Sequence, residues 1–240
     1  ITATAGLNEG IVTGETTYTC HQRMKFYDIE VGCTGYHNDI SVAGALRVSC
    51  NIYFYELGRR LGIDKITEYA SLYGYGQHTG IETGDYAGAI GNPETFNDIG
   101  LDWTVGQVLQ AAIGQSETSV TPLQMAGVAS TIANRGVRYK THLVDSIYDY
   151  SMENEIEKIE PEIAETIDIN YDYVYDYVID GMVQASENNF PADYSLSNLG
   201  FDVAIKTGTP QNWRNGDEVT DSCFIGFAPA DDPQIAFAGM

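Results

Sequence analysis

The sequence predicts an α+β fold with a mainly helical first part and an antiparallel sheet towards its end. Apolar residues recur at helical spacing through much of residues 1–136. Two short apolar runs close the chain, at 223–228 and 235–239, and the Asp-Asp-Pro turn at 231–233 separates them. We therefore expect one compact unit, with a helical lobe mainly within 1–136 and a sheet part mainly within 137–240.

Seven helical segments carry the periodicity behind this expectation. Thr121 and Pro122 form the signature of a helix start, a polar cap followed by proline at the first helical position. Glycines at positions 10, 62 and 136 are expected to end helices, because glycine is favoured just past a helix end. The predicted helices are residues 1–9, 39–48, 52–61, 64–73, 104–113, 122–134 and 172–186.

The segments between these helices are predicted as loops and strands. Residues 11–38 show no clean period and are expected to be irregular. Residues 77–102 are rich in glycine, with Asn92-Pro93 as a turn signal, so they predict a long loop, and long loops are often functional. Alternation over 144–150 and the apolar run 201–205 predict strands.

Bulk composition indicates a folded domain and excludes some partners. The chain has 240 residues, of which 43% are hydrophobic and 19% charged, as in ordinary globular proteins. Its net charge of −22 repels phosphate groups, so we expect no binding of nucleic acid and no docking on anionic lipid. The chain starts at Ile1 and stops at Met240 inside an apolar run, so we expect a domain that is incomplete at both ends.

Cysteines and histidines show no metal-binding spacing. The four cysteines are Cys20, Cys33, Cys50 and Cys223, and no pair is spaced as C-x-x-C. Cys20 and Cys33 share one irregular stretch, where a disulfide and two unpaired thiols are both open. The four histidines are His21, His37, His78 and His142. None of them belongs to a ligand motif such as H-E-x-x-H, so we predict no metal and no cofactor.

Two short motifs carry the chemistry. Ser49-Cys50-Asn51 is an S-x-N triplet between two predicted helices, and Lys206-Thr207-Gly208-Thr209 follows a predicted strand. The second motif suits a substrate with a free carboxylate: Lys206 offers a cation, and Thr207 and Thr209 offer hydroxyls. The N–H of Thr209 is a candidate donor to a developing oxyanion. Gly208 permits close backbone approach, so a peptide can add beside the strand.

The first motif suits proton transfer in an acyl-transfer reaction. The Ser49 hydroxyl can both accept a proton and donate it to a leaving amine. Asn51 can hydrogen-bond a substrate amide and orient a neighbouring lysine. The alternative interpretations are that Ser49 and Asn51 are helix caps, that Lys206 is an exposed charge at a strand end, and that Cys50 is simply buried.

Four further stretches resemble class B penicillin-binding proteins. The resemblance covers residues 49–63, 121–126, 132–136 and 224–229. It implies a peptidoglycan D,D-transpeptidase with an antiparallel sheet flanked by helices plus an all-helical lobe. It also implies stem peptides as substrates, β-lactams as acylating ligands, other cell-wall synthesis proteins as partners, and a membrane-anchored protein on the extracytoplasmic face. In that family Ser49, Asn51 and Lys206 match catalytic positions, and Thr207, Gly208 and Thr209 match substrate-binding positions.

One departure from the family pattern leaves alternatives open. Such enzymes carry an S-x-x-K motif with the nucleophilic serine, and this chain contains none. Because Ile1-Thr2-Ala3 resembles the residues that follow that motif, we expect the serine to lie just upstream of Ile1 and this chain to be inactive by itself. A serine β-lactamase, a β-lactam sensor and a non-catalytic scaffold that kept the fold remain as alternatives.

Overall fold

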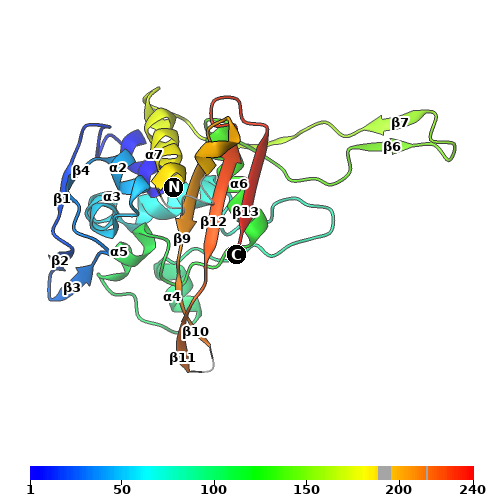
Figure 1. Ribbon diagram of the computed structural model, residues 1–240. Helices are drawn as coiled ribbons and strands as arrows, with labels where there is room; N and C mark the ends of the chain where they lie inside the picture. The colour runs from blue at the N-terminus through cyan, green and yellow to red at the C-terminus, as the bar shows by residue number, and fades with distance from the viewer. Residues whose placement is uncertain (189–195, 215) are drawn as a thin grey trace.

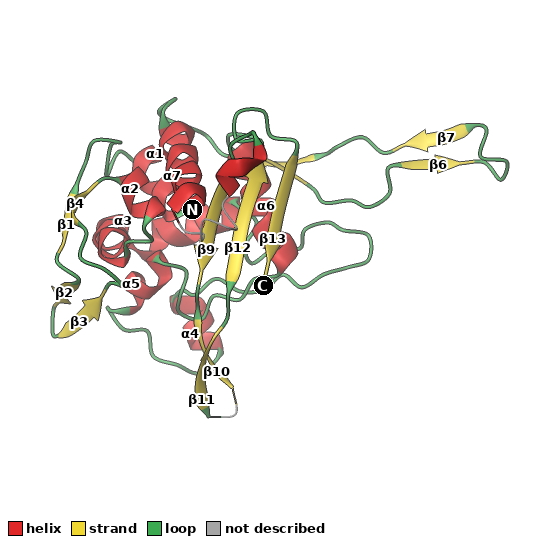
Figure 2. Ribbon diagram, viewed as in Figure 1, coloured by secondary structure: helices red, strands yellow, loops and turns green. Residues whose placement is uncertain are grey.

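The computed structural model describes residues 1–188, 196–214 and 216–240 (Figure 1). Helices group beside a three-stranded sheet, and one thin hairpin projects far from the body (Figure 2). The predicted α+β class is confirmed. None of the described helices combines the length and the apolar character needed to cross a bilayer. The division into lobes at residue 136 stays a prediction.

The predicted helices are present close to their expected positions, and two further helical segments, at 93–98 and 196–199, were not predicted. They are α1 (Thr2–Asn8), α2 (Val42–Arg47), α3 (Asn51–Leu72), α4 (Pro93–Asp98), α5 (Gln107–Ala112), α6 (Pro122–Ala133), α7 (Val174–Asn188) and a 3-10 turn (Leu196–Leu199). Two predicted helices are merged in α3, but Gly62 inside it has φ of +78°, so the backbone breaks where the glycine predicts. Thr121 caps α6 and Pro122 begins it, as expected.

The main sheet has the strand order β13-β12-β9, and its strands are antiparallel. It consists of β9 (Ala204–Gly208), β12 (Cys223–Ala228) and β13 (Ile235–Gly239). Two-stranded ribbons make up the remaining strands: β1 (Tyr18–Cys20) with β4 (Asn38–Ile40), β2 (Arg23–Phe26) with β3 (Ile29–Gly32), β5 (Val137–Tyr139) with β8 (Ile163–Thr166), β6 (Ser146–Tyr148) with β7 (Glu155–Lys158), and β10 (Gln211–Arg214) with β11 (Asp217–Thr220).

Three local predictions were wrong. Residues 11–38 are not irregular throughout, because they contain β1, β2 and β3. The helix predicted from residue 39 begins only at Val42, since residues 38–40 pair with β1 and Ser41 then caps the helix. Asn92-Pro93 starts a helix rather than a turn: the Asn92 side chain accepts a hydrogen bond from the Thr95 N–H at 2.9 Å, and Pro93 occupies the first helical position.

Helix α7 joins the two halves of the molecule. It contacts both α2 and β9, and it lies between them in Figure 1. Its buried face consists of Val174, Tyr175, Val178, Met182 and Ala185. Gly181 permits a very close approach to α2, because a Cβ added there would lie 2.8 Å from the Cβ of Leu46. One helix therefore fixes the end of α2 relative to the strand β9.

Candidate functional site

The structure brings the two sequence motifs together. Lys206 Nζ donates a hydrogen bond to Ser49 Oγ at 2.6 Å, although the two residues are 157 positions apart. Lys206 Nζ also donates to the Thr207 carbonyl oxygen at 2.5 Å. The ammonium group is thus held at the point where α2 ends and β9 ends.

Ser49 sits in a strained turn that closes α2. Its φ is +53°, a left-handed conformation that costs a residue with a side chain about 1–2 kcal/mol. The Ser49 N–H bonds to the Leu46 carbonyl and the Cys50 N–H to the Ala45 carbonyl, which is the Schellman pattern of helix ends. This turn aims the hydroxyl at Lys206, so the strain lies at a residue of the site, as is common at functional positions.

Helix α3 begins directly after this turn. Its N-cap residue is Cys50, so neither Ser49 nor Asn51 is the N-cap. Asn51 is the first residue of the helix, and its amide lies 3.5 Å from the Gly32 carbonyl, which makes at best a weak hydrogen bond. The amide of Asn51 is therefore only weakly engaged by Gly32.

Strand β9 presents the K-T-G-T motif at one edge of the sheet. Among the described strands, β9 pairs only with β12, so its other edge is open to an added strand. Gly208 lies opposite Cys223 in the register, and a Cβ at Gly208 would lie 2.8 Å from Cys223 Sγ. Thr209 follows the strand and is exposed. A side chain at position 208 would therefore press against the thiol of the neighbouring strand.

Burial changes the acidity of Lys206. Desolvation lowers its pKa to about 8, and the neighbouring Cys223 opposes this shift weakly. Burial likewise raises the pKa of Cys223, against the attraction of Lys206. A half-buried ammonium group that titrates near neutral pH can both hold a carboxylate and exchange a proton with Ser49.

A buried glutamine organises the glycine-rich loop. Gln124 on α6 donates through Nε2 to the carbonyls of Gly74 (3.3 Å), Gln77 (2.8 Å) and Ala87 (2.7 Å), and its Oε1 accepts from the Thr121 N–H at 2.8 Å. Sequence reasoning found the Thr121 cap but missed this role, although a glutamine three residues after the cap is the signal of a capping box.

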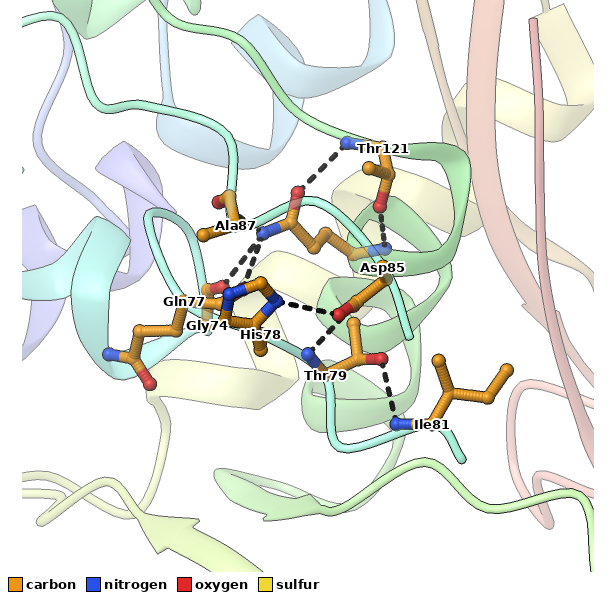
Figure 3. A network of polar contacts seen from close by, with 9 residues as sticks. Gly74, Gln77, His78, Thr79, Ile81, Asp85, Ala87 and Thr121 are labelled. Carbon is orange, nitrogen blue, oxygen red and sulfur yellow. Dashed lines mark hydrogen bonds and ion pairs between the residues drawn. The ribbon is translucent and has the colours of Figure 1, made fainter. Parts of the chain in front are cut away.

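Figure 3 shows a second tether within the same loop. The His78 ring and the Thr79 N–H both contact the Asp85 carboxylate, at 2.9 Å and 2.8 Å. The backbone N–H of Thr79 is the main cause that holds the pKa of Asp85 below its ordinary value. The glycine-rich loop is therefore held by defined polar contacts.

The cysteines are unpaired. All four are free thiols, so of the two possibilities for Cys20 and Cys33 the structure has no disulfide. Instead, Cys20, Cys33, His37 and Cys50 bring their ligand atoms within 4.8 Å of one another. Short ligand motifs do not reveal this cluster, because its members follow neither C-x-x-C nor H-E-x-x-H spacing.

Comparison with known proteins identifies a matching family and similar relatives. Residues 1–240 match the penicillin binding protein transpeptidase domain. The peptidoglycan D,D-transpeptidase MrdA of Acinetobacter baumannii is 27% identical over 224 residues, which are 84% of this chain and 31% of that protein. The chain thus spans about a third of that relative's length.

Solved structures of penicillin-binding proteins are similar to this chain over nearly its whole length. The crystal structure of Pseudomonas aeruginosa PBP2 in complex with WCK 5153 superposes with a TM-score of 0.84 at 28% identity, covering 99% of this chain and 53% of that one. A peptidoglycan synthase complex that coordinates polymerization and crosslinking contains a chain with a TM-score of 0.83 at 27% identity, covering 99% of this chain and 40% of that one. The chain therefore belongs to the penicillin-binding protein transpeptidase domain family.

Proposed function

We propose that this chain forms most of the catalytic cleft of a peptidoglycan D,D-transpeptidase, which cross-links stem peptides by serine acyl transfer. The observation that carries the proposal is the 2.6 Å hydrogen bond from Lys206 to Ser49. It joins a cation for the substrate carboxylate to a hydroxyl for proton transfer. The family membership and the named relatives support the same reaction.

Each motif residue has a proposed role in that reaction. The donor stem peptide lies along the open edge of β9, where Gly208 permits close approach. Lys206, Thr207 and Thr209 hold its terminal carboxylate, and the Thr209 N–H donates to the oxyanion. Ser49 passes a proton to the leaving D-alanine amine.

Asn51 is proposed to hydrogen-bond the peptide amide and to orient a lysine. The attacking serine and its lysine belong to an S-x-x-K motif, which this chain lacks. The proposed reaction needs that motif from elsewhere in the full-length protein. β-Lactams would acylate the same serine.

The setting of the enzyme is part of the proposal. Stem peptides carry free carboxylates, so a strongly acidic chain needs a local cation such as Lys206 to hold them. The peptidoglycan synthase complex supports other cell-wall synthesis proteins as partners. We place the domain on the extracytoplasmic face of the cell membrane, where its substrate is.

Labelling with a fluorescent penicillin tests the assignment. Lys206→Ala in the full-length protein should slow acylation at least about tenfold, because the carboxylate loses a charged hydrogen-bond donor. Lys158→Ala is the matched control: Lys158 pairs with Asp145 on the projecting hairpin, and its loss should leave the rate unchanged. Equal rates for wild type and Lys206→Ala would remove Lys206 from the site. Rapid loss of the label by hydrolysis would favour a β-lactamase instead.

A further inference from the structure

One segment of the chain stands away from the rest of the molecule. This projecting hairpin, residues 145–160, consists of β6, β7 and the turn between them, and Figure 1 shows it far from the main sheet and the helices. Neither strand pairs with any other described strand or packs extensively on another described element. A two-stranded hairpin is marginally stable in water by itself. The side chains of the hairpin are therefore not buried against the described part of this chain.

Polar contacts fix the root of the projecting hairpin. The Glu82 carboxylate accepts hydrogen bonds from the N–H groups of Leu143 at 2.9 Å and Val144 at 3.2 Å. The Thr141 N–H donates to the Thr79 carbonyl oxygen at 3.0 Å. Both acceptors belong to the glycine-rich loop, which is itself tied to α6. The hairpin is therefore anchored to the body where it leaves it.

The tip of the hairpin is ordered around one carboxylate. Asp149 accepts hydrogen bonds from Ser151 Oγ at 2.8 Å and from Asn154 Nδ2 at 2.6 Å. The Asp149 carbonyl also accepts from the Met152 N–H at 3.0 Å, and Met152 has a φ of +60°, which is uncommon for a residue with a side chain. This turn leaves Tyr150 fully exposed and Met152 72% exposed. A tip that is ordered in advance loses less entropy when a partner binds.

The exposed side chains of the hairpin are those of a protein interface. Tyr150 and Met152 lie at the tip, and Ile156, 67% exposed, lies on β7. Aromatic residues and methionine are enriched in protein interfaces. Residues that dominate binding energy fill well-packed pockets of the partner. The convex tip therefore suits a concave apolar surface.

Charge indicates which kind of surface that is. The hairpin has one lysine, Lys158, which is already paired with Asp145 at 2.5 Å. With six carboxylates its net charge is −5, and the whole chain carries −22. These charges repel a second copy of the chain, anionic lipid and cell-wall peptides with free carboxylates, and they attract lysine and arginine. The six carboxylates belong to Asp145, Asp149, Glu153, Glu155, Glu157 and Glu160.

We propose that the projecting hairpin docks on a partner protein whose surface is basic and has an apolar cleft. Tyr150 and Met152 enter the cleft, and the carboxylates beside them pair with lysine and arginine at its rim. The hairpin joins the body between β5 and β8 rather than at β9, so this contact leaves the open edge of β9 free. The inference does not depend on the transpeptidase assignment.

Photocrosslinking of the full-length protein in its own cells tests the proposal. The photoreactive amino acid p-benzoylphenylalanine replaces Tyr150, and mass spectrometry identifies the adduct and the crosslinked site. We expect one other protein, crosslinked at a site surrounded by lysine and arginine. Tyr27, which is 72% exposed on the turn between β2 and β3, is the control position and should not give this adduct.

Substitutions on the hairpin test the charge and the tip separately. Glu153→Lys with Glu155→Lys should lower the adduct yield more than about tenfold, because like charges then face each other. Asp231→Lys with Asp232→Lys makes the same change in net charge at the exposed turn between β12 and β13, and it should keep the adduct. Met152→Ser leaves the charge unchanged and should also lower the yield. Equal urea midpoints for the purified variants and wild type would show that folding is unaffected.

Several results would overturn the proposal. They are no adduct at position 150 above the level at position 27, an adduct with a second copy of the chain, with lipid or with glycan, and a crosslinked site without basic residues. A yield that the Glu153 and Glu155 reversal leaves unchanged would overturn it too. Crosslinking is measured apart from acylation, so a failed transpeptidase assignment would not decide it.

Discussion

The contact between α7 and α2 predicts opposite outcomes for two matched substitutions. Gly181→Ala places a Cβ 2.8 Å from two carbons of Leu46 and 3.0 Å from the Cα of Ala43. Carbon atoms prefer about 3.5–4.0 Å, so the Leu46 contacts are too short by about 0.7 Å or more. Rotation of the Leu46 side chain can move its Cδ1, but Leu46 Cβ and Ala43 Cα are fixed by the backbone of α2. The helix α2 itself must therefore shift by about 0.5 Å or more. Overpacking of this kind costs about 1–3 kcal/mol.

Gly127→Ala is the matched control within α6. A Cβ there meets nothing within 4 Å, and the position is helical. Alanine is favoured over glycine in a helix interior by about 1 kcal/mol, and this gain applies to both variants. The difference between their free energies of unfolding therefore isolates the packing clash, and we expect Gly181→Ala to be the less stable by about 1–3 kcal/mol.

Urea denaturation followed by circular dichroism measures both variants. Because α2 ends in the turn at Ser49, Gly181→Ala should also slow acylation by a fluorescent penicillin, while Gly127→Ala should not. A stability difference below about 0.5 kcal/mol, which is the ordinary scatter of neutral surface changes, would refute the reasoning. It would mean that α7 and α2 are less tightly packed than the distances indicate.

Two further predictions concern the site and its loop. The pKa of Lys206 is about 8 in the folded state, below the ordinary lysine value of 10.5 that applies to the unfolded state. Between these two pH values the unfolded state binds the proton more strongly than the folded state does. Wild type should therefore gain stability relative to Lys206→Met as the pH rises from 8 to 10.5, and a pH-independent difference in urea midpoints would contradict the shift. Gln124→Ala leaves buried carbonyls without donors and should cost about 2–4 kcal/mol in the same assay, whereas Gln234→Ala removes one exposed hydrogen bond and should cost under about 0.5 kcal/mol. Equal losses for the two glutamines would show that the loop does not depend on Gln124.

Several features followed from local chemistry and could be predicted. The Thr121-Pro122 start of α6, the break at Gly62 and the strands β12 and β13 depend on neighbouring residues, which a sequence displays. The S-x-N and K-T-G-T motifs were identified for the same reason. Local signals gave the wrong secondary structure where pairing with a distant strand decided it. Residues 38–40 are an example, because they pair with β1 as a strand.

By itself, the sequence determined the helical periodicity, the turn residues and the two motifs, because these reside in adjacent positions along the chain. Only the tertiary structure decided that Lys206 reaches Ser49, since α7 must first pack on both α2 and β9. Likewise, only the fold brings His37 and three separate cysteines together, because no spacing along the chain encodes distances across hairpins. Contacts between distant segments depend on packing geometry, which periodicity and propensity do not contain.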